Sequence, residues 1–382
     1  SSVNAAILNS SADSIKRIDS IDLVRGLVMI IMALDHTREY MHFSSITQSP
    51  TDLNHTTAAL FFTRWITHLC APIFVFLSGT SAYISLKKQD NLSKSRNFLL
   101  SRGLWLLILE FSIVNFALWF DIQFRILIFE VIATIGFGFI VLALLLKVSP
   151  RVIGIIGLII IFGYGMLQYI PIPDHSLLKT VLSYLFSPAA APVTPNLMFV
   201  MGYPPIPWLG IMLTGYASGQ LFTDHQRKNT FLKIGLSALA LFIAIRWLNV
   251  YGDPSVWSVQ KTNLFTFLSF INVSKYPPSL LFCLITLGIM FLLLSFAEGI
   301  KNRFTDLISV YGQVPLFYFL IHLFLIHSLM LAMVFLQGYR WSDLTFGGFT
   351  MGRPKTDSGV GLWQTYLIWM VVVIALYPLC KW

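Results

Sequence analysis

An apolar run near the start of the chain contains six ionisable side chains that are candidates for chemistry: Asp22, Arg25, Asp35, His36, Arg38 and Glu39. Arg25 and His36 are separated by about three helical turns, so on a helix they share one face and lie about 16 Å apart. Imidazole exchanges protons near neutral pH, and a carboxylate beside it, Asp35, assists that exchange. The pattern favours a catalytic or proton-handling role for His36, with Asp35 as its partner.

Two further apolar runs contain groups that suit the same chemistry. Arg64 and His68 are spaced to share a helix face, at the expected depth of His36. Tyr318 stands about one turn before His322 in a later run. The candidate catalytic residues are therefore Asp35, His36, Arg64, His68 and His322.

Structural interpretations compete with the catalytic one at several positions. Asp22 and Arg25 suit an ion pair at a helix end. Arg38 and Glu39 suit the solvated interface of a membrane. We expect Arg125 to pair with Glu130 across two helices, and we expect His327 to be a hydrogen-bonded histidine of the helix bundle.

The spacing of the histidines gives no support for a metal site. No His-x-x-x-His pair with an adjacent Glu occurs, although a site built from His36, His68 and His322 is geometrically conceivable. Phosphate-binding glycine loops and the G-x-S-x-G nucleophile motif are also missing from the sequence. We therefore expect no metal cofactor.

Composition predicts the class of protein that must position these residues. Of 382 residues, 56% are hydrophobic and 11% are charged, whereas soluble domains carry about 25% charged residues. Lipid must therefore act as the solvent for much of the surface. The net charge of +9 comes mainly from Lys and Arg in short loops. This distribution is typical of membrane proteins and does not indicate nucleic-acid binding.

The apolar runs predict an all-α integral membrane protein of about ten (ten to eleven) helices that forms a single domain over residues 1–382. The expected spans are 21–42, 60–86, 98–119, 124–146, 151–170, 204–222, 231–249, 277–297, 309–337 and 361–380. Every second loop is basic, beginning with Lys16 and Arg17, which predicts cytoplasmic termini. Segments 171–203, 250–276 and 338–360 are then extracytoplasmic, and residues 177–186 are expected to form a short interfacial helix.

Three motifs resemble those of membrane acyltransferases. The stretch from Arg17 through Asp22 and Arg25-Gly26 to Asp35-His36 has the Arg-x10-His spacing of the acyltransferase-3 type. Residues 72–79 resemble the Phe-Phe-x-Leu-Ser-Gly segment of that superfamily, and residues 316–322 resemble its Tyr-x-x-x-His helix. The whole chain, and residues 16–86 most strongly, is similar to bacterial relatives of heparan-alpha-glucosaminide N-acetyltransferase.

This resemblance implies transfer of an acetyl group from cytoplasmic acetyl-CoA to a hydroxyl or amine of an extracytoplasmic sugar or glycan. His36 would act as general base, oriented by Asp35, or as a transient acyl carrier. Arg64 or His68 would stabilise the oxyanion, and His322 and Tyr318 would position the acyl group or its acceptor. The basic loop with Arg25 at its entrance would hold the CoA phosphates. The expected cofactor-binding residues are Asp22, Arg25, Ser78, Lys87, Lys88, Arg96, Arg102 and Tyr318. The resemblance also implies the bacterial inner membrane, and a homodimer is compatible with the sequence.

A proton-coupled transporter or flippase is the alternative from another functional class. It would use His36, Glu110 and His322 as a proton relay. Many transporters are built from internal repeats, and this chain shows no convincing repeat. A catalytically inactive scaffold is a third interpretation, which the density of charge inside apolar runs disfavours.

Overall fold

The computed structural model describes residues 18–382, so Lys16 and Arg17 of the sequence motif lie outside the described residues. The α-helices are α2 (Asp19–Met41), α3 (Ala58–Thr67), α4 (Cys70–Lys88), α5 (Leu92–Leu109), α6 (Asn115–Trp119), α7 (Val131–Leu144), α8 (Pro150–Gly163), α9 (Leu177–Phe186), α10 (Pro205–Ser218), α11 (Arg227–Leu248), α12 (Asn263–Ile271), α13 (Leu280–Ala297), α14 (Arg303–Gln313), α15 (Pro315–Leu336) and α16 (Leu362–Lys381). Short π- and 3-10 segments are η2 (Glu110–Val114), η3 (Tyr164–Tyr169), η4 (Gly219–Thr223) and η5 (Trp341–Asp343).

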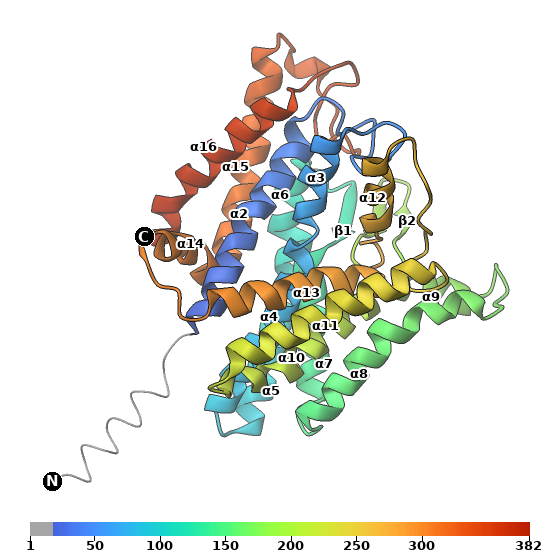
Figure 1. The fold of residues 1–382 in the computed structure, drawn as a ribbon. Helices are drawn as coiled ribbons and strands as arrows, with labels where there is room; N and C mark the ends of the chain where they lie inside the picture. The colour runs from blue at the N-terminus through green and yellow to red at the C-terminus, as the bar shows by residue number, and fades with distance from the viewer. Residues whose placement is uncertain (1–17) are drawn as a thin grey trace.

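Helix α2 lies at the centre of the molecule (Figure 1), where it contacts α3, α4, α13, α14, α15 and α16. Its closest approach is to α14. A Cβ atom on Gly26 would lie 2.0 Å from the carbonyl oxygen of Ile308, and one on Gly312 would lie 1.9 Å from that of Asp22. The two backbones therefore touch directly, which fixes the helix that carries Arg25 and His36.

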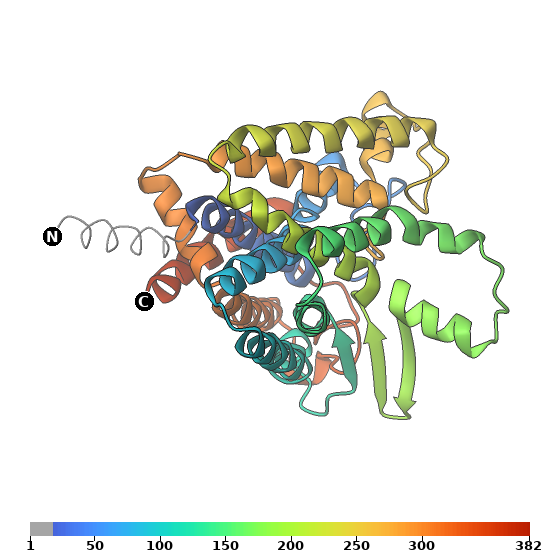
Figure 2. The ribbon, with the colours of Figure 1, turned by 90° about the horizontal axis from the view of Figure 1, so that it is seen from below.

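The remaining helices surround this centre in pairs. Helix α10 packs between α4 and α8, α5 packs on α7, and α11 runs beside α13 (Figure 2). The α4–α10 contact depends on glycines, since a Cβ atom on Gly79 would lie 2.3 Å from the oxygen of Met212. The glycine of the Leu-Ser-Gly motif therefore serves helix packing, whereas Ser78 beside it is only half-buried.

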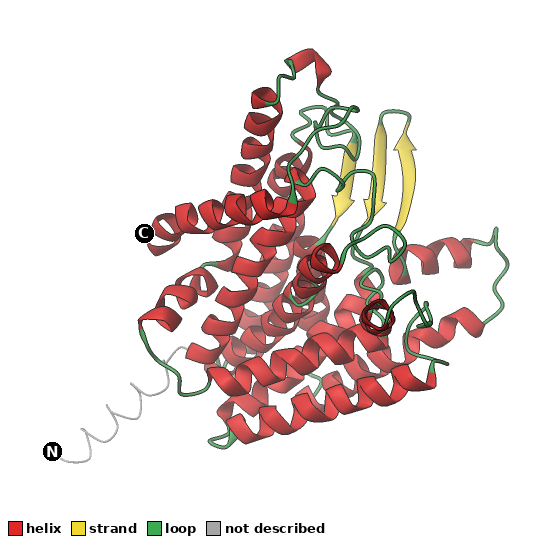
Figure 3. Cartoon of the chain, turned by 45° about the horizontal axis from the view of Figure 1, so that its top comes forward, coloured by secondary structure: helices red, strands yellow, loops and turns green. Residues whose placement is uncertain are grey.

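A small sheet interrupts the expected all-α architecture (Figure 3). Strands β1 (Ile126–Phe129), β2 (Ala189–Thr194) and β3 (Leu197–Met201) pair in the order β1-β3-β2. Strand β1 is parallel to β3, with Ile126 opposite Met198, and β2 is antiparallel to β3. The expected helical architecture therefore holds for most of the described chain but not for this sheet, and the expectation of one continuous span over 124–146 is wrong.

Local chemistry explains why the helix does not run through residues 120–130. Phe120 and Phe124 have positive φ angles of 47° and 48°, which end the helix that precedes them. The Asn115 side chain then hydrogen-bonds to both the backbone N–H (2.8 Å) and the carbonyl (3.0 Å) of Ile128. Arg125 pairs with Asp121 at 3.0 Å, so the expected Arg125–Glu130 pair across helices is also wrong.

Seven helices within residues 18–382 are long and apolar enough to cross a membrane. These are Ala58–Lys88, Leu92–Trp119, Pro150–Tyr169, Arg227–Leu248, Leu280–Ala297, Pro315–Leu336 and Leu362–Lys381. The other expected spans correspond to the charge-rich α2 and to α7 and α10, which have 14 residues each. Length and composition of the helices thus describe an integral, multi-pass membrane protein.

The three long connecting segments are folded rather than irregular. Segment 171–203 contains α9, as the sequence predicts, together with β2 and β3. In segment 338–360, Arg353 is buried and donates to the carbonyl oxygens of His42 and Ser358. The carbonyl oxygens of Ser255, Ser269, Phe270 and Asn272 accept hydrogen bonds from Arg246 of α11. Buried guanidinium groups therefore fix these segments against the helices.

Candidate active site

A cavity of about 680 Å³ lies beside the second half of α2, and we call it the His36 cavity. Its wall comes from α2, α3, α4, the β1–α7 junction, the β2–β3 hairpin and the segment before α13. Its ionisable lining residues include Asp35, His36, Arg38, Glu39, Arg64, Glu130 and Lys275. Three of the five sequence-predicted catalytic residues, Asp35, His36 and Arg64, therefore line one cavity.

A chain of hydrogen bonds fixes the protonation of His36. Nδ1 of His322 lies 3.0 Å from the carbonyl oxygen of Tyr318, which can only accept, so this nitrogen carries a proton. In a neutral imidazole, Nε2 of His322 is then an acceptor, and it lies 2.7 Å from Nδ1 of His36. His36 therefore donates through Nδ1 and keeps a lone pair on Nε2, to which no described residue hydrogen-bonds.

These hydrogen bonds give His322 a different role from the expected positioning of a ligand. His322 is fully buried and contacts His36 from outside the lining of the cavity, so it orients His36 rather than touching a ligand. The Tyr318 ring stacks on His322, with centroids 5.1 Å apart and planes at 14°. Tyr318 is itself fully buried, and its position supports the histidine pair instead of a cofactor.

Asp35 is engaged by two arginines instead of by His36. One carboxylate oxygen accepts from Arg64 at 3.0 Å, and the other accepts from Arg38 at 3.3 Å. Arg64 also donates to Thr67. The expected orientation of His36 by Asp35 therefore gives way to orientation by His322. Asp35 instead holds the Arg64 guanidinium at the edge of the cavity.

Lys275 is a cavity residue that the sequence analysis missed. Its side chain is 8% exposed, and its Nζ atom lies 5.7 Å and 5.1 Å from the ring centroids of Tyr203 and Tyr276. Among the described residues it forms no ion pair. A lysine in an expected loop carries no sequence signal of burial, because only the fold places it beneath two aromatic rings.

Asp35, His36 and Glu39 bring one potential ligand atom each to within 4.8 Å of one another. This grouping meets the geometric requirement for a metal site, but the positive charge of the neighbouring arginines opposes the binding of a cation. Asp35 already neutralises part of the charge of Arg38 and Arg64, and a divalent cation there would face both guanidinium groups. The chemistry of this set suits proton transfer better than metal ligation.

A second cavity of about 320 Å³, the Arg25 cavity, lies towards the other end of α2. It is lined by Arg25, Arg102 and the serines Ser78, Ser81 and Ser85, with Arg25 Nη2 donating to Ser81 Oγ at 2.7 Å. Phe74 lines this cavity and also the His36 cavity. Phe74 is 7% exposed, so one aromatic side chain lies between a basic cavity and the histidine pair.

The remaining expected residues lie away from the two cavities. His68 is buried against the Phe282 ring, and its Nδ1 has no hydrogen-bond partner within the described chain. Asp22 lines a separate groove with Lys301 and Arg303. At the end of α4, Lys87 lies over the Tyr83 ring and Lys88 is exposed. Near the start of α5, Arg96 donates a hydrogen bond to the carbonyl oxygen of Ala143.

Comparison with known protein families gives a match. The sequence model for the heparan-alpha-glucosaminide N-acetyltransferase catalytic family matches residues 17–258. That stretch covers most of the 382 residues and includes α2, α3 and α4, which carry His36, Arg64 and Phe74. No curated protein matches the chain. The extent of the family match shows that the chain belongs to the heparan-alpha-glucosaminide N-acetyltransferase catalytic family.

Proposed function

We propose that this protein transfers an acetyl group from acetyl-CoA, held in the Arg25 cavity, to a hydroxyl or amino group of a sugar or glycan in the His36 cavity. The observation that carries the proposal is the pair of cavities that share Phe74. One has the cations that a phosphorylated donor requires, and the other has an imidazole with a free lone pair. Family membership supports acetyl transfer as the chemistry.

The positive charge of the Arg25 cavity supports acetyl-CoA as the donor. CoA carries several phosphate charges, and guanidinium groups bind phosphate through paired hydrogen bonds. Arg25 and Arg102 line the cavity, and Lys87 and Lys88 stand at the end of α4 nearby in sequence. The basic loops predict that the end of α4 that carries Lys87 and Lys88 faces the cytoplasm, where acetyl-CoA is available. The pantetheine arm then extends past Phe74, and the thioester reaches His36.

The tautomer of His36 supports its role as the base that activates the acceptor. Nε2 removes the proton from the acceptor hydroxyl or amine as that group attacks the thioester carbonyl. The tetrahedral intermediate carries a negative oxygen, which the Arg64 guanidinium stabilises. Collapse of the intermediate breaks the C–S bond, and the leaving thiolate of CoA takes up the proton from His36. The same lone pair on Nε2 also suits direct attack, in which case acetyl-imidazole forms first.

Acetyl transfer by purified protein in lipid nanodiscs tests this proposal. Radiolabelled acetyl-CoA is incubated with a panel of hexoses, hexosamines and their glycosides, and the labelled product is separated. His36→Gln is expected to abolish transfer while acetyl-CoA binding by calorimetry persists, and Arg25→Gln is expected to weaken binding. His55→Gln is the matched control, because His55 is exposed and pairs only with Asp52 in the described chain. Transfer at the wild-type rate by His36→Gln would refute the proposal.

The transporter alternative requires a continuous proton path through Glu110, and the structure offers no support for one. Glu110 is fully buried and accepts a hydrogen bond from the backbone N–H of Glu130. The hydrogen bonds that begin at His36 end instead at the carbonyl oxygen of Tyr318. Within residues 18–382 no direct hydrogen bond joins Glu110 to either histidine. The acetyltransferase is therefore the function that the site supports best.

A further inference from the structure

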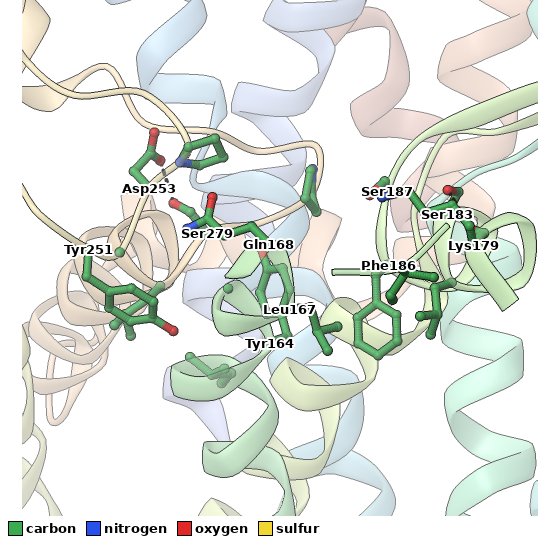
Figure 4. Close-up of a pocket in the computed structure, with 18 residues that line it drawn as sticks. Tyr164, Leu167, Gln168, Lys179, Ser183, Phe186, Ser187, Tyr251, Asp253 and Ser279 are labelled. Atoms are coloured by element: carbon green, nitrogen blue, oxygen red, sulfur yellow. Dashed lines mark hydrogen bonds between the residues drawn. The ribbon is translucent and has the colours of Figure 1, made fainter. Parts of the chain in front are cut away.

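A third hollow of about 300 Å³ lies between α8–η3, α9 and the start of α13, and we call it the α9 groove. Figure 4 shows that Lys179, Ser183 and Phe186 of α9 lie on one side of it, and Tyr164, Tyr251 and Ser279 lie on the other. Its lining is mixed in character. Aromatic and aliphatic side chains form the floor, with Tyr164 and Phe186 stacked at 6.3 Å, and Lys179 adds one cation.

The surroundings of the α9 groove are those of a membrane surface. Helix α9 has no buried residue, and its apolar side chains are open, with Leu177 at 80% and Val181 at 44% exposure. Tyr169 and Ile170, at the end of the η3 segment, are also exposed, at 63% and 53%. Exposed apolar and aromatic residues at the end of a membrane-spanning helix are typical of the lipid interface. A hydrocarbon chain at such an interface would lie next to the groove.

The α9 groove adjoins the His36 cavity along two separate stretches of chain. Ser187 lines the groove and Pro188 lines the cavity, where α9 continues into β2. Pro277 lines the groove and Tyr276 lines the cavity, in the segment before α13. Adjacent residues thus face opposite sides of one shared wall in both segments. Lys275, next to Tyr276, places its charge on the cavity side of that wall.

We propose that the acceptor is a lipid-linked glycan whose linkage to the hydrocarbon chain is acidic. The chain lies in the α9 groove, the acidic linkage lies at the shared wall beside Lys275, and the sugar reaches His36. This inference rests on the proposed acetyl transfer and specifies its acceptor. Charge complementarity supports it, because Lys275 has no carboxylate within ion-pair distance in the described chain and Lys179 lines the groove. Asp253, the carboxylate that also lines the groove, already accepts hydrogen bonds from the Ser274 N–H and the Ser279 hydroxyl.

Photo-crosslinking tests the groove independently of turnover. The full-length protein is placed in phosphatidylcholine nanodiscs with a glucosyl phosphate ester whose long alkyl chain carries a diazirine. Labelled peptides are mapped by mass spectrometry after irradiation. The expected label lies on residues 161–187 and 251–280, about tenfold above that on other lipid-facing helices, which corresponds to about 1.4 kcal/mol of preference. Lys275→Met is expected to lower this labelling, and Lys275→Arg to retain it.

Two variants of α9 form a matched pair for the same experiment. Ser183→Trp places an indole in the groove, and Val181→Trp places one on an exposed position outside its lining. Labelling is expected to fall to background in the first and to persist in the second. A diazirine phosphatidylcholine serves as the bulk-lipid probe. Equal groove labelling by both probes, or no groove labelling by the glucosyl phosphate in the wild type, would overturn the inference.

Turnover separates this inference from the proposed function. If the groove is labelled but no acetyl group reaches any glycoside, then the acetyl transfer proposal fails while the lipid site stands. If methyl glycosides and long-chain glycosyl phosphates are acetylated with equal KM, and the groove is unlabelled, then acetyl transfer stands and the lipid-linked acceptor is wrong. A lower KM for the long-chain acceptor, lost in Ser183→Trp alone, supports both.

Discussion

Replacement of His322 by phenylalanine is the sharpest test of the active-site geometry. The phenyl ring keeps the stacking surface for Tyr318 but removes the acceptor that lies 2.7 Å from Nδ1 of His36. The Nδ1–H of His36 then has no partner unless the ring changes tautomer or rotates. Either change takes the lone pair on Nε2 away from the position where it receives the acceptor proton.

The size of the effect follows from the hydrogen bond. A half-buried donor left without a partner costs about 1–3 kcal/mol. If the transition state alone bears that cost, then kcat falls about 5- to 150-fold. KM for acetyl-CoA is expected to stay unchanged, because His322 lines neither cavity. His322→Gln is expected to recover part of the rate, since its amide oxygen can accept the same bond.

His327 provides the control on the same helix. It is also fully buried, and its ring nitrogens lie 2.7 Å from the carbonyl oxygens of Ala117 and Met351, away from both cavities. His327→Phe is therefore expected to lower the melting temperature and leave kcat of the folded fraction intact. Steady-state acetyl transfer and thermal unfolding measure the two effects. Equal loss of kcat in His322→Phe and His327→Phe would refute the tautomer argument.

Four further outcomes are expected. Phe74→Ala joins the two cavities, so hydrolysis of acetyl-CoA without an acceptor is expected to rise, with a loss of stability of about 3–5 kcal/mol; hydrolysis at the wild-type rate would contradict its role as a barrier. Lys275→Met is expected to raise KM about tenfold for acidic acceptors only, and equal changes for neutral acceptors would argue against charge recognition. Gly79→Ala is expected to lower the melting temperature, because its Cβ would lie 2.3 Å from a backbone oxygen, whereas Gly163→Ala, with nothing within 4 Å, is neutral. Dialysis against EDTA is expected to leave acetyl transfer unchanged, and reactivation by added Zn²⁺ or Mg²⁺ would instead identify a metal site.

Helix periodicity predicts much of the site because α2 is a single regular helix. The Arg25–His36 spacing predicts one face with a cation at one end and an imidazole at the other, and the structure places the two residues in the linings of two cavities that share Phe74. The spacing of Arg64 and His68 does not place both in the site. Arg64 lines the His36 cavity, whereas His68 contacts Phe282 outside its lining. Spacing predicts a shared helix face, but only the packed neighbours decide which side chains of that face reach a cavity.

Long-range contacts account for what the sequence does not predict. The His36–His322 bond joins residues 286 positions apart, and no local pattern specifies such a pairing. Strand β1 is a short apolar run, and periodicity alone does not distinguish a short buried strand from a piece of helix. Its partner β3 lies in a segment expected to be a loop. The His36–His322 hydrogen bond and the β1–β3 pairing both join residues that are far apart in the sequence, so local patterns do not predict them.

The partners of the buried cations distinguish structural residues from ligand-binding ones. A buried cation is costly unless hydrogen bonds or an opposite charge compensate it. Arg246 and Arg353 donate four hydrogen bonds each, mostly to backbone carbonyls, and Arg38 pairs with Asp35. Lys275 has two tyrosine rings and an open side towards the His36 cavity. No carboxylate of the described chain lies within ion-pair distance of it, although Asp35, Glu39 and Glu130 line the same cavity. Lys275 is therefore the buried cation to which the proposed acidic acceptor is assigned.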